Sequence, residues 1–289
     1  MIAGCGSGTT TPPATTSAEP PPPKLEKPCR AAPAPHRYEH VVLLVLENHG
    51  YSAIAGHSPY LNELAAACGL ATNYHAVSHP SLPNYLALTS GSTHGITSDC
   101  TDCPVSAPSI FGQLRGDWHS YLEAMPSPGF EGGSSGDYAK KHNPAAYYTA
   151  IASAYAHLDV PLASLPEALA SGKLSRFTLV VPDLCNDEHN CPPSTGDVWL
   201  ELWLPRLFAS PAYKSGTTAL FITYDEGTGA ANRVYTVVAA PSVRPHTVVA
   251  APFDHYSLLR TVEKLLGLPC LANACRAQSM AESFRLALS

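Results

Sequence analysis

The chain has 289 residues, of which 45% are hydrophobic and 14% are charged, and its formal net charge is −6. Such a composition can bury a full core, which excludes a protein that is disordered over most of its length. No run of basic residues stands out, so nucleic acid is excluded as an expected partner. A negative protein with a negative substrate needs local positive charge, from a metal ion or from a few Lys, His and Arg side chains.

The first 36 residues predict an anchor and a tether. Residues 1–5 resemble the end of a bacterial lipoprotein signal, in which Cys5 carries lipid, and the alternative is a chance cysteine near the terminus. Residues 6–36 are rich in Gly, Ser, Thr and Pro, which is typical of a semi-rigid linker. The sequence has no apolar stretch of about 20 residues that would span a membrane. We therefore expect an exported protein, either secreted or attached to a membrane only through lipid.

Residues 37–289 alternate strand-like and helix-like segments. Apolar runs predict strands at 41–46, 177–181, 219–224 and 234–239, and a further strand is predicted at 120–125. Helices are predicted at 58–68, 83–88 and 255–266, and another begins at Asp197 as its N-cap, with Pro205 expected to kink or end it. This alternation predicts one α/β domain with a mostly parallel central sheet sandwiched by helices. The active site of such a sheet lies beyond the carboxyl ends of its strands.

Two of the predicted strands end in carboxylates. Glu47 follows the strand at 41–46, and Asp225 and Glu226 follow the strand at 219–224. A single acid in this position is most simply a solvated loop residue or a helix cap. Because the pattern recurs, we expect these carboxylates to converge on one cation.

Ser81 stands at the start of the helix predicted at 83–88. The free N–H groups and the positive dipole end of a helix N-terminus favour both an alkoxide and an incoming phosphate. Asn84, in the first turn, is expected to hydrogen-bond a phosphoryl oxygen. The alternative is that Ser81 is only an N-cap, and Ser78 is the rival nucleophile.

Three further polar segments can contribute to the same site. Asp187 and His189 offer an oxygen and a nitrogen ligand two residues apart, unless their loop is simply a polar surface loop. His255 begins a predicted helix, either as a metal ligand or as an ordinary first-turn residue. Residues 140–142, Lys-Lys-His, form a compact positive cluster that suits phosphate oxygens but needs no function as surface charge.

Nine cysteines predict an oxidised protein. With Cys5 set aside, three close pairs stand at 100/103, 185/191 and 270/275, which leaves 29/68 as the fourth pair. The alternative is a structural zinc site at Cys100-x2-Cys103, but no second CxxC stands nearby, so we favour disulfides.

Taken in order, these motifs resemble the acid phosphatase and phospholipase C type phosphoesterase family, within the alkaline-phosphatase-like superfamily. The resemblance runs from Val41 to Pro269 and rests on several short motifs, namely Glu47-Asn48, His79-Pro80-Ser81, Pro83-Asn84-Tyr85, Tyr138-Ala139-Lys140-Lys141-His142, Asn186-Asp187 with His189, Gly196-Asp197, Asp225-Glu226 and His255-Tyr256. The sequence departs from the family pattern at His49, where relatives often carry Arg and Ser.

The resemblance implies metal-assisted phosphoester hydrolysis on an alkaline-phosphatase-like fold. Carried over residue by residue, it implies Ser81 as the nucleophile, with Asn84, His142 and His189 as further catalytic residues. It implies substrate contacts by Asn48, His79 and Lys141, and metal ligands at Glu47, Asp187, His189, Asp225, Glu226 and His255. The divalent metal is zinc, calcium or magnesium, and the number of ions stays open.

We therefore expect an extracytoplasmic, monomeric acid phosphatase that hydrolyses phosphate monoesters of small molecules or lipids. A phospholipase C-type phosphodiesterase is the alternative within the same chemistry. A lipoprotein that binds a phosphorylated ligand without hydrolysing it is the alternative outside enzymes. Ser81→Ala separates the two classes, because a binding protein keeps its function and a hydrolase loses it.

Overall fold

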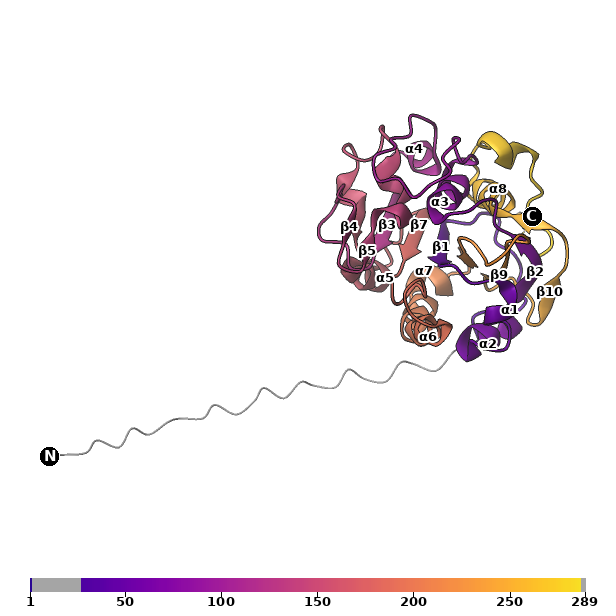
Figure 1. Ribbon diagram of the computed structural model, residues 1–289. Helices are drawn as coiled ribbons and strands as arrows, with labels where there is room; N and C mark the ends of the chain where they lie inside the picture. Colours follow the sequence, from indigo (N-terminus) through magenta and orange to yellow (C-terminus); the bar gives the residue numbers. More distant parts are fainter. Residues whose placement is uncertain (2–26, 287–289) are drawn as a thin grey trace.

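The computed structural model describes residue 1 and residues 27–286. The strands are β1 (His40–Leu46), β2 (Gly69–His75), β3 (Trp118–Leu122), β4 (Ser134–Ser135), β5 (Tyr138–Ala139), β6 (Asp159–Pro161), β7 (Phe177–Val181), β8 (Thr218–Tyr224), β9 (Arg233–Ala239), β10 (Thr247–Val249) and β11 (Phe253–Asp254). Nine of them form the central sheet, in the order β10-β2-β9-β8-β1-β7-β3-β6, with β11 paired to β2 (Figure 1). Only β9 runs antiparallel to its neighbours in this sheet, so the predicted mostly parallel sheet is confirmed.

Helices cover both faces of the sheet. The helices are α1 (Tyr51–Ile54), α2 (Pro59–Ala67), α3 (Ser81–Ser90), α4 (Ile110–Leu114), α5 (Leu165–Ser171), α6 (Pro193–Ala209), α7 (Pro211–Lys214) and α8 (His255–Leu266). Short 3-10 turns are η1 (Lys140–His142), η2 (Pro144–Tyr147), η3 (Ala156–Leu158), η4 (Leu162–Ser164) and η5 (Ala272–Arg276). Helices α3, α4 and α8 pack together on one face, and α2, α5, α6 and α7 pack together on the other (Figure 1).

Helix α6 differs from its prediction at two positions. Asp197 lies inside this helix, and its carboxylate instead caps α2, accepting from the N–H groups of Tyr60 and Leu61 at 3.0 and 2.9 Å. Pro205 also lies inside α6, which continues to Ala209. Residue Glu201, whose carbonyl loses its helical partner to this proline, is exposed to solvent, so water can replace the missing N–H.

The segment before β1 is attached to the domain from residue 28 onward. Cys29 forms a disulfide with Cys68, the Tyr213 hydroxyl donates to the Pro28 carbonyl at 3.0 Å, and the Ala31 N–H donates to the Val243 carbonyl at 3.0 Å. The predicted lipid-bearing Cys5 and residues 6–26 of the predicted linker lie outside the described residues. Within residues 27–286, no helix combines the length and the apolar character needed to cross a membrane.

All four predicted disulfides are confirmed. They join Cys29 to Cys68, Cys100 to Cys103, Cys185 to Cys191 and Cys270 to Cys275. Bonds of this number are typical of a protein that folds in an oxidising compartment outside the cytosol.

A buried acid at the edge of the sheet makes stability depend on pH. Burial raises the pKa of Asp159 to about 7, although Asn143 Nδ2 donates to its Oδ2 at 2.7 Å. Between roughly pH 4 and pH 7 the folded protein holds a proton that the unfolded chain has released, so stability falls as pH rises through this window. We expect Asp159→Asn to reduce this slope and to raise the free energy of unfolding at pH 8 by roughly 1–3 kcal/mol.

Urea unfolding at pH 5 and pH 8 measures this effect. The control is Glu167→Gln, which removes an exposed acid on α5 and should leave the pH slope unchanged. Equal slopes for the wild type and Asp159→Asn would contradict the assignment.

Candidate active site

The carboxyl ends of parallel strands bring four segments together at one edge of the sheet. Glu47 directly follows β1, Asp225 follows β8, the loop that carries Asp187 follows β7, and Ser81 begins α3 after β2. Backbone bonds tie three of these segments together: the Glu47 N–H donates to the Asp187 carbonyl at 2.8 Å, and the Asp225 N–H donates to the Leu46 carbonyl at 2.9 Å. The parallel strands therefore bring these segments to one edge of the sheet.

Glu47 is the centre of this group, and its side chain is fully buried. The Ser81 hydroxyl donates to its Oε2 at 3.0 Å, and the Tyr85 hydroxyl donates to its Oε1 at 2.5 Å. Ser81 and Tyr85 lie one helical turn apart on α3, so one face of that helix holds the carboxylate at two points. Although burial would raise the pKa of Glu47, the neighbouring His142 outweighs burial and holds that pKa below its ordinary value.

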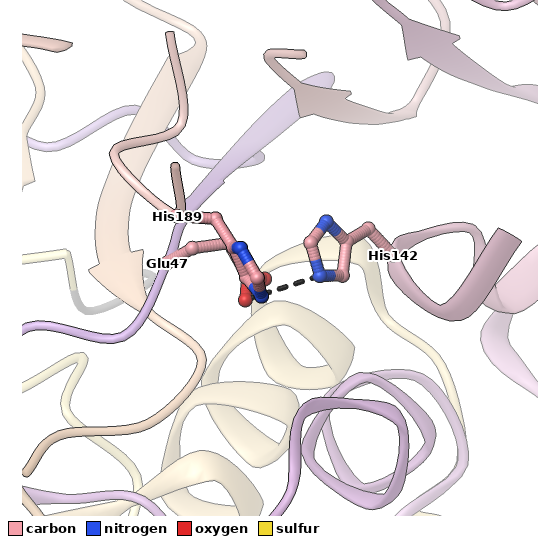
Figure 2. A group of neighbouring side chains, drawn as sticks. All are labelled: Glu47, His142 and His189. Carbon is pink, nitrogen blue, oxygen red and sulfur yellow. Dashed lines mark ion pairs between the residues drawn. The ribbon is translucent and has the colours of Figure 1, made fainter. Parts of the chain in front are cut away.

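His142 lies between two buried carboxylates. Its Nε2 is 3.1 Å from Glu47 Oε2 and its Nδ1 is 3.2 Å from Asp187 Oδ2. Burial lowers the pKa of His142, but Glu47 and Asp187 outweigh burial and raise it to about 10. Figure 2 shows His142, Glu47 and His189 pointing toward one another, from η1, the end of β1 and the loop after β7. A protonated imidazole in this position is a proton donor beside the serine.

Asp225 adds a further buried carboxylate to the group. Its pKa is raised well above the ordinary value by burial and by the negative charges of Glu47 and Glu226. Its Oδ1 accepts from the Asn48 N–H at 3.2 Å, whereas within residues 27–286 neither Asp225 Oδ2 nor the side-chain Oδ1 of Asn48 has a hydrogen-bond partner. Carboxylates crowded without matching donors fit a divalent cation, which takes oxygen ligands of this kind.

A second candidate ligand set includes histidines. One ligand atom each from Glu47, His142 and His189 lies within 4.8 Å of the others. A histidine must be neutral to bind a metal, whereas the paired carboxylates favour the charged form of His142. Metal binding at this set would therefore displace a proton from His142, and Glu47, His142 and His189 stay a second candidate ligand set.

Lys141 and His189 form a hydrogen-bonded pair within the site. Lys141 Nζ donates to His189 Nε2 at 3.0 Å, and the ring Nδ1–H of His189 donates to Asn190 Oδ1 at 2.8 Å. The His189 N–H also donates to Asp187 Oδ1 at 2.8 Å. His189 is therefore held in position through its backbone N–H and both ring nitrogens.

His79 and Glu226 form a further pair, close in sequence to Ser81 and Asp225. The His79 ring hydrogen-bonds the Glu226 carboxylate through Nδ1. About half of the His79 side chain is exposed, whereas Glu226 is nearly buried. His79 is therefore the member of the pair that solvent reaches.

Two predicted site residues have their polar atoms occupied elsewhere. Both His255 nitrogens face protein partners, because Nε2–H donates to the Asp225 carbonyl at 2.5 Å and Nδ1 accepts from the Tyr74 hydroxyl at 3.0 Å. Burial lowers the pKa of His255 to about 4, so it is a neutral ring behind Asp225. Asn84 accepts from the Val77 and Ser78 N–H groups and donates to the Ser78 and Pro80 carbonyls, which shapes the turn before Ser81.

Two residues of the site were missed by sequence reasoning. Tyr85 stands four residues after Ser81 on the same helix, a spacing that signals a shared face. Asp99 accepts from the Leu82 N–H at 3.0 Å and from Lys141 Nζ at 3.0 Å, yet it stands in an irregular segment with no periodic signal.

The Cys185–Cys191 disulfide encloses the loop that carries Asp187 and His189. We expect its replacement by two serines to lower the free energy of unfolding by roughly 2 kcal/mol, and to lower kcat because both side chains lose their fixed positions. The matched control is the Cys270–Cys275 bond, which spans a similar sequence separation of 5 against 6. Removal of the Cys270–Cys275 bond should lower the free energy of unfolding by a similar amount and leave kcat unchanged. Urea unfolding and steady-state kinetics measure the two effects. Equal kcat values for the two variants would show that the Cys185–Cys191 bond does not position Asp187 and His189 for catalysis.

The chain is similar in sequence to known phosphatases. A family model described as the Phosphoesterase family matches residues 57–269. A phosphatidylinositol-3-phosphatase from Mycobacterium tuberculosis is 33% identical over 255 residues, which cover 86% of this chain and 83% of the relative. An acid phosphatase from Aspergillus fumigatus is 30% identical over 244 residues, which cover 78% of this chain and 54% of the relative. The chain thus spans about half the length of this fungal relative.

Solved structures agree with the observed fold. A protein in the alkaline phosphatase superfamily from Vibrio parahaemolyticus superimposes with a TM-score of 0.57 at 12% identity, covering 90% of this chain and 76% of that chain. The lipoteichoic acid synthase from Listeria monocytogenes gives a TM-score of 0.58 at 11% identity, covering 81% of this chain and 73% of that chain. The expected alkaline-phosphatase-like fold is therefore confirmed.

Proposed function

This chain belongs to the phosphoesterase family and is a phosphoric ester hydrolase, and from that premise we propose that it hydrolyses phosphate monoesters with Ser81 as its nucleophile. The observation that carries the proposal is the placement of the Ser81 hydroxyl. It opens helix α3 and donates to the buried Glu47 carboxylate at 3.0 Å, so the proton that leaves during attack has an acceptor in place.

A divalent cation belongs in this proposal, held by Glu47, Asn48 and Asp225, with Glu226 close by. The support is the crowding of buried carboxylates and the two buried oxygens without donors. When bound, the cation would neutralise phosphoryl charge and lower the pKa of the serine hydroxyl. His255 is left out of the ligand set, because both of its nitrogens have protein partners. Zinc, calcium and magnesium are the ions to test.

The reaction uses the remaining side chains in separate roles. Ser81 Oγ attacks phosphorus, the bond to the ester oxygen breaks, and that oxygen takes a proton from His142, which its two carboxylate neighbours favour in the charged form. Water then attacks phosphorus and gives a proton to His142, the bond from phosphorus to Ser81 Oγ breaks, and Glu47 returns the proton to Oγ. Lys141 and His79 are suited to bind the phosphoryl oxygens, since both are polar and partly exposed beside the serine's helix.

A direct assay separates this proposal from its alternatives. Purified protein is incubated with p-nitrophenyl phosphate and with bis-p-nitrophenyl phosphate between pH 4 and pH 9, with and without chelator. We expect hydrolysis of the monoester, its loss in chelator and its return with added metal. Faster cleavage of the diester would favour the phospholipase C-type alternative, and binding without hydrolysis would favour a binding protein.

The name of the mycobacterial relative also suggests a lipid substrate. We propose phosphorylated lipid headgroups as the first physiological candidates, because that relative covers most of the chain. The test offers a water-soluble phosphomonoester and vesicles that contain phosphatidylinositol 3-phosphate to the same enzyme preparation. The lipidation of Cys5 and a monomeric state stay proposals, tested by detergent partitioning of full-length protein and by light scattering.

A further inference from the structure

Asp99 joins two parts of the site that come from distant segments of the chain. Its Oδ1 accepts from the N–H of Leu82, the second residue of α3, at 3.0 Å. Its Oδ2 accepts from Lys141 Nζ at 3.0 Å, and this ammonium in turn donates to His189 Nε2 at 3.0 Å. One carboxylate therefore spans the helix of the nucleophile and the positive side of the site.

Asp99 directly precedes a turn that is held firmly. The Cys100–Cys103 disulfide closes it, the Tyr147 hydroxyl donates to the Cys100 carbonyl at 2.9 Å, and Lys140 Nζ donates to the Thr101 carbonyl at 3.0 Å. Lys140 thus contacts this turn and Lys141 contacts Asp99 beside it, from adjacent positions in η1. A carboxylate on so restrained a turn can fix the position of a flexible lysine, which otherwise samples many rotamers.

We propose that Asp99 is a positioning residue that holds the Lys141 ammonium in place for a phosphoryl oxygen. The inference rests on the proposed function, and it assigns to Asp99 a task that no motif in the sequence indicates. Lys141 retains a donor for substrate, because an ammonium has three N–H groups and Asp99 and His189 occupy two of them. Without Asp99, the lysine would have to be ordered at the moment when substrate binds.

The variant Asp99→Asn tests this role with little disturbance of the helix. The new amide oxygen can still accept from the Leu82 N–H, whereas the charge that pairs with Lys141 is lost. We expect KM for p-nitrophenyl phosphate to rise roughly tenfold, with kcat changed by less than about threefold. Asp99→Glu should recover part of the loss, because it restores the charge.

A binding measurement gives a readout that does not depend on turnover. Isothermal titration of inorganic phosphate into metal-loaded Ser81→Ala protein gives a dissociation constant, and adding Asp99→Asn should weaken it roughly tenfold. Lys141→Met should have a similar effect, and combining it with Asp99→Asn should cause little further loss, because both changes disable the same cation.

The matched control is Asp102→Asn, an exposed acid in the same disulfide turn, which should leave KM and phosphate binding unchanged. Unchanged phosphate binding in Asp99→Asn would overturn the proposal. Tighter binding would also overturn it, since that result would show Asp99 competing with phosphate for Lys141. A fall in kcat that matches a loss of thermal stability would reduce Asp99 to a structural residue. If the wild-type protein hydrolysed no phosphate ester, the proposed function itself would fail.

Discussion

Ser81→Ala should lower kcat for p-nitrophenyl phosphate by about a thousandfold or more while the protein stays folded. The hydroxyl is buried at the start of α3, and its hydrogen-bond partner among the described residues is Glu47 Oε2. The loss of this one bond should change the free energy of unfolding by only about 1 kcal/mol, because Tyr85 and His142 still contact Glu47. Steady-state kinetics and urea unfolding measure the two effects.

Ser78→Ala is the matched control for this prediction. Ser78 lies three residues earlier, and its hydroxyl donates to the His79 carbonyl rather than to a carboxylate. Its variant should keep most of the activity. If activity were lost in Ser78→Ala and kept in Ser81→Ala, the nucleophile would be misassigned.

Asp225→Asn should abolish hydrolysis and yet preserve or raise the stability of the metal-free protein. Asp225 is fully buried near Glu47 and Glu226, so a neutral amide relieves repulsion among these acids. The new side-chain oxygen can still accept from the Asn48 N–H, and the backbone carbonyl still accepts from His255. We expect kcat to fall about a thousandfold and the stabilisation by added divalent metal to disappear.

Thermal unfolding in chelator and in zinc, calcium or magnesium measures this second prediction. Wild-type protein should melt at a higher temperature with its metal, whereas Asp225→Asn should melt at one temperature in all buffers. The control is Asp254→Asn, which changes the same charge but keeps a side-chain cap for α8, where Asp254 Oδ1 accepts from the Ser257 N–H at 2.8 Å. A metal response retained in Asp225→Asn would place the ion among other ligands, such as the set with His142 and His189.

The sequence predicted the strands that are buried on both faces and missed those that are not. Strands β1, β7 and β8 consist almost wholly of buried apolar residues, so a continuous apolar run identified each of them. Strand β2 mixes buried and half-buried positions and contains Gly, Thr and Asn, so its pattern resembles a loop. The reversed direction of β9 was also invisible, because an apolar run does not encode the direction of a strand.

The candidate site was predictable as a location but not as a set of contacts. Glu47 and Asp225 were found because each directly follows a buried strand, and the topology of a parallel sheet then brings them together. His255 was expected in the site because it begins a predicted helix, but its ring faces Tyr74 and the Asp225 backbone, and sequence spacing does not say where a side chain points. Asp99 was missed because its contacts with Leu82 and Lys141 span 17 and 42 residues of sequence.

The same dispersed assembly makes enzyme activity a late marker of folding. Asn48 and Asp225 are 177 positions apart in the chain, and they meet only when β1 and β8 pair in parallel. Two strands so far apart in the chain lose much conformational entropy before their stabilising contacts form. The pairing of β1 with β8 is therefore slow compared with helix formation. Recovery of hydrolysis after dilution from denaturant should therefore lag behind recovery of helical circular dichroism, and the length of that lag would time the closure of the central sheet.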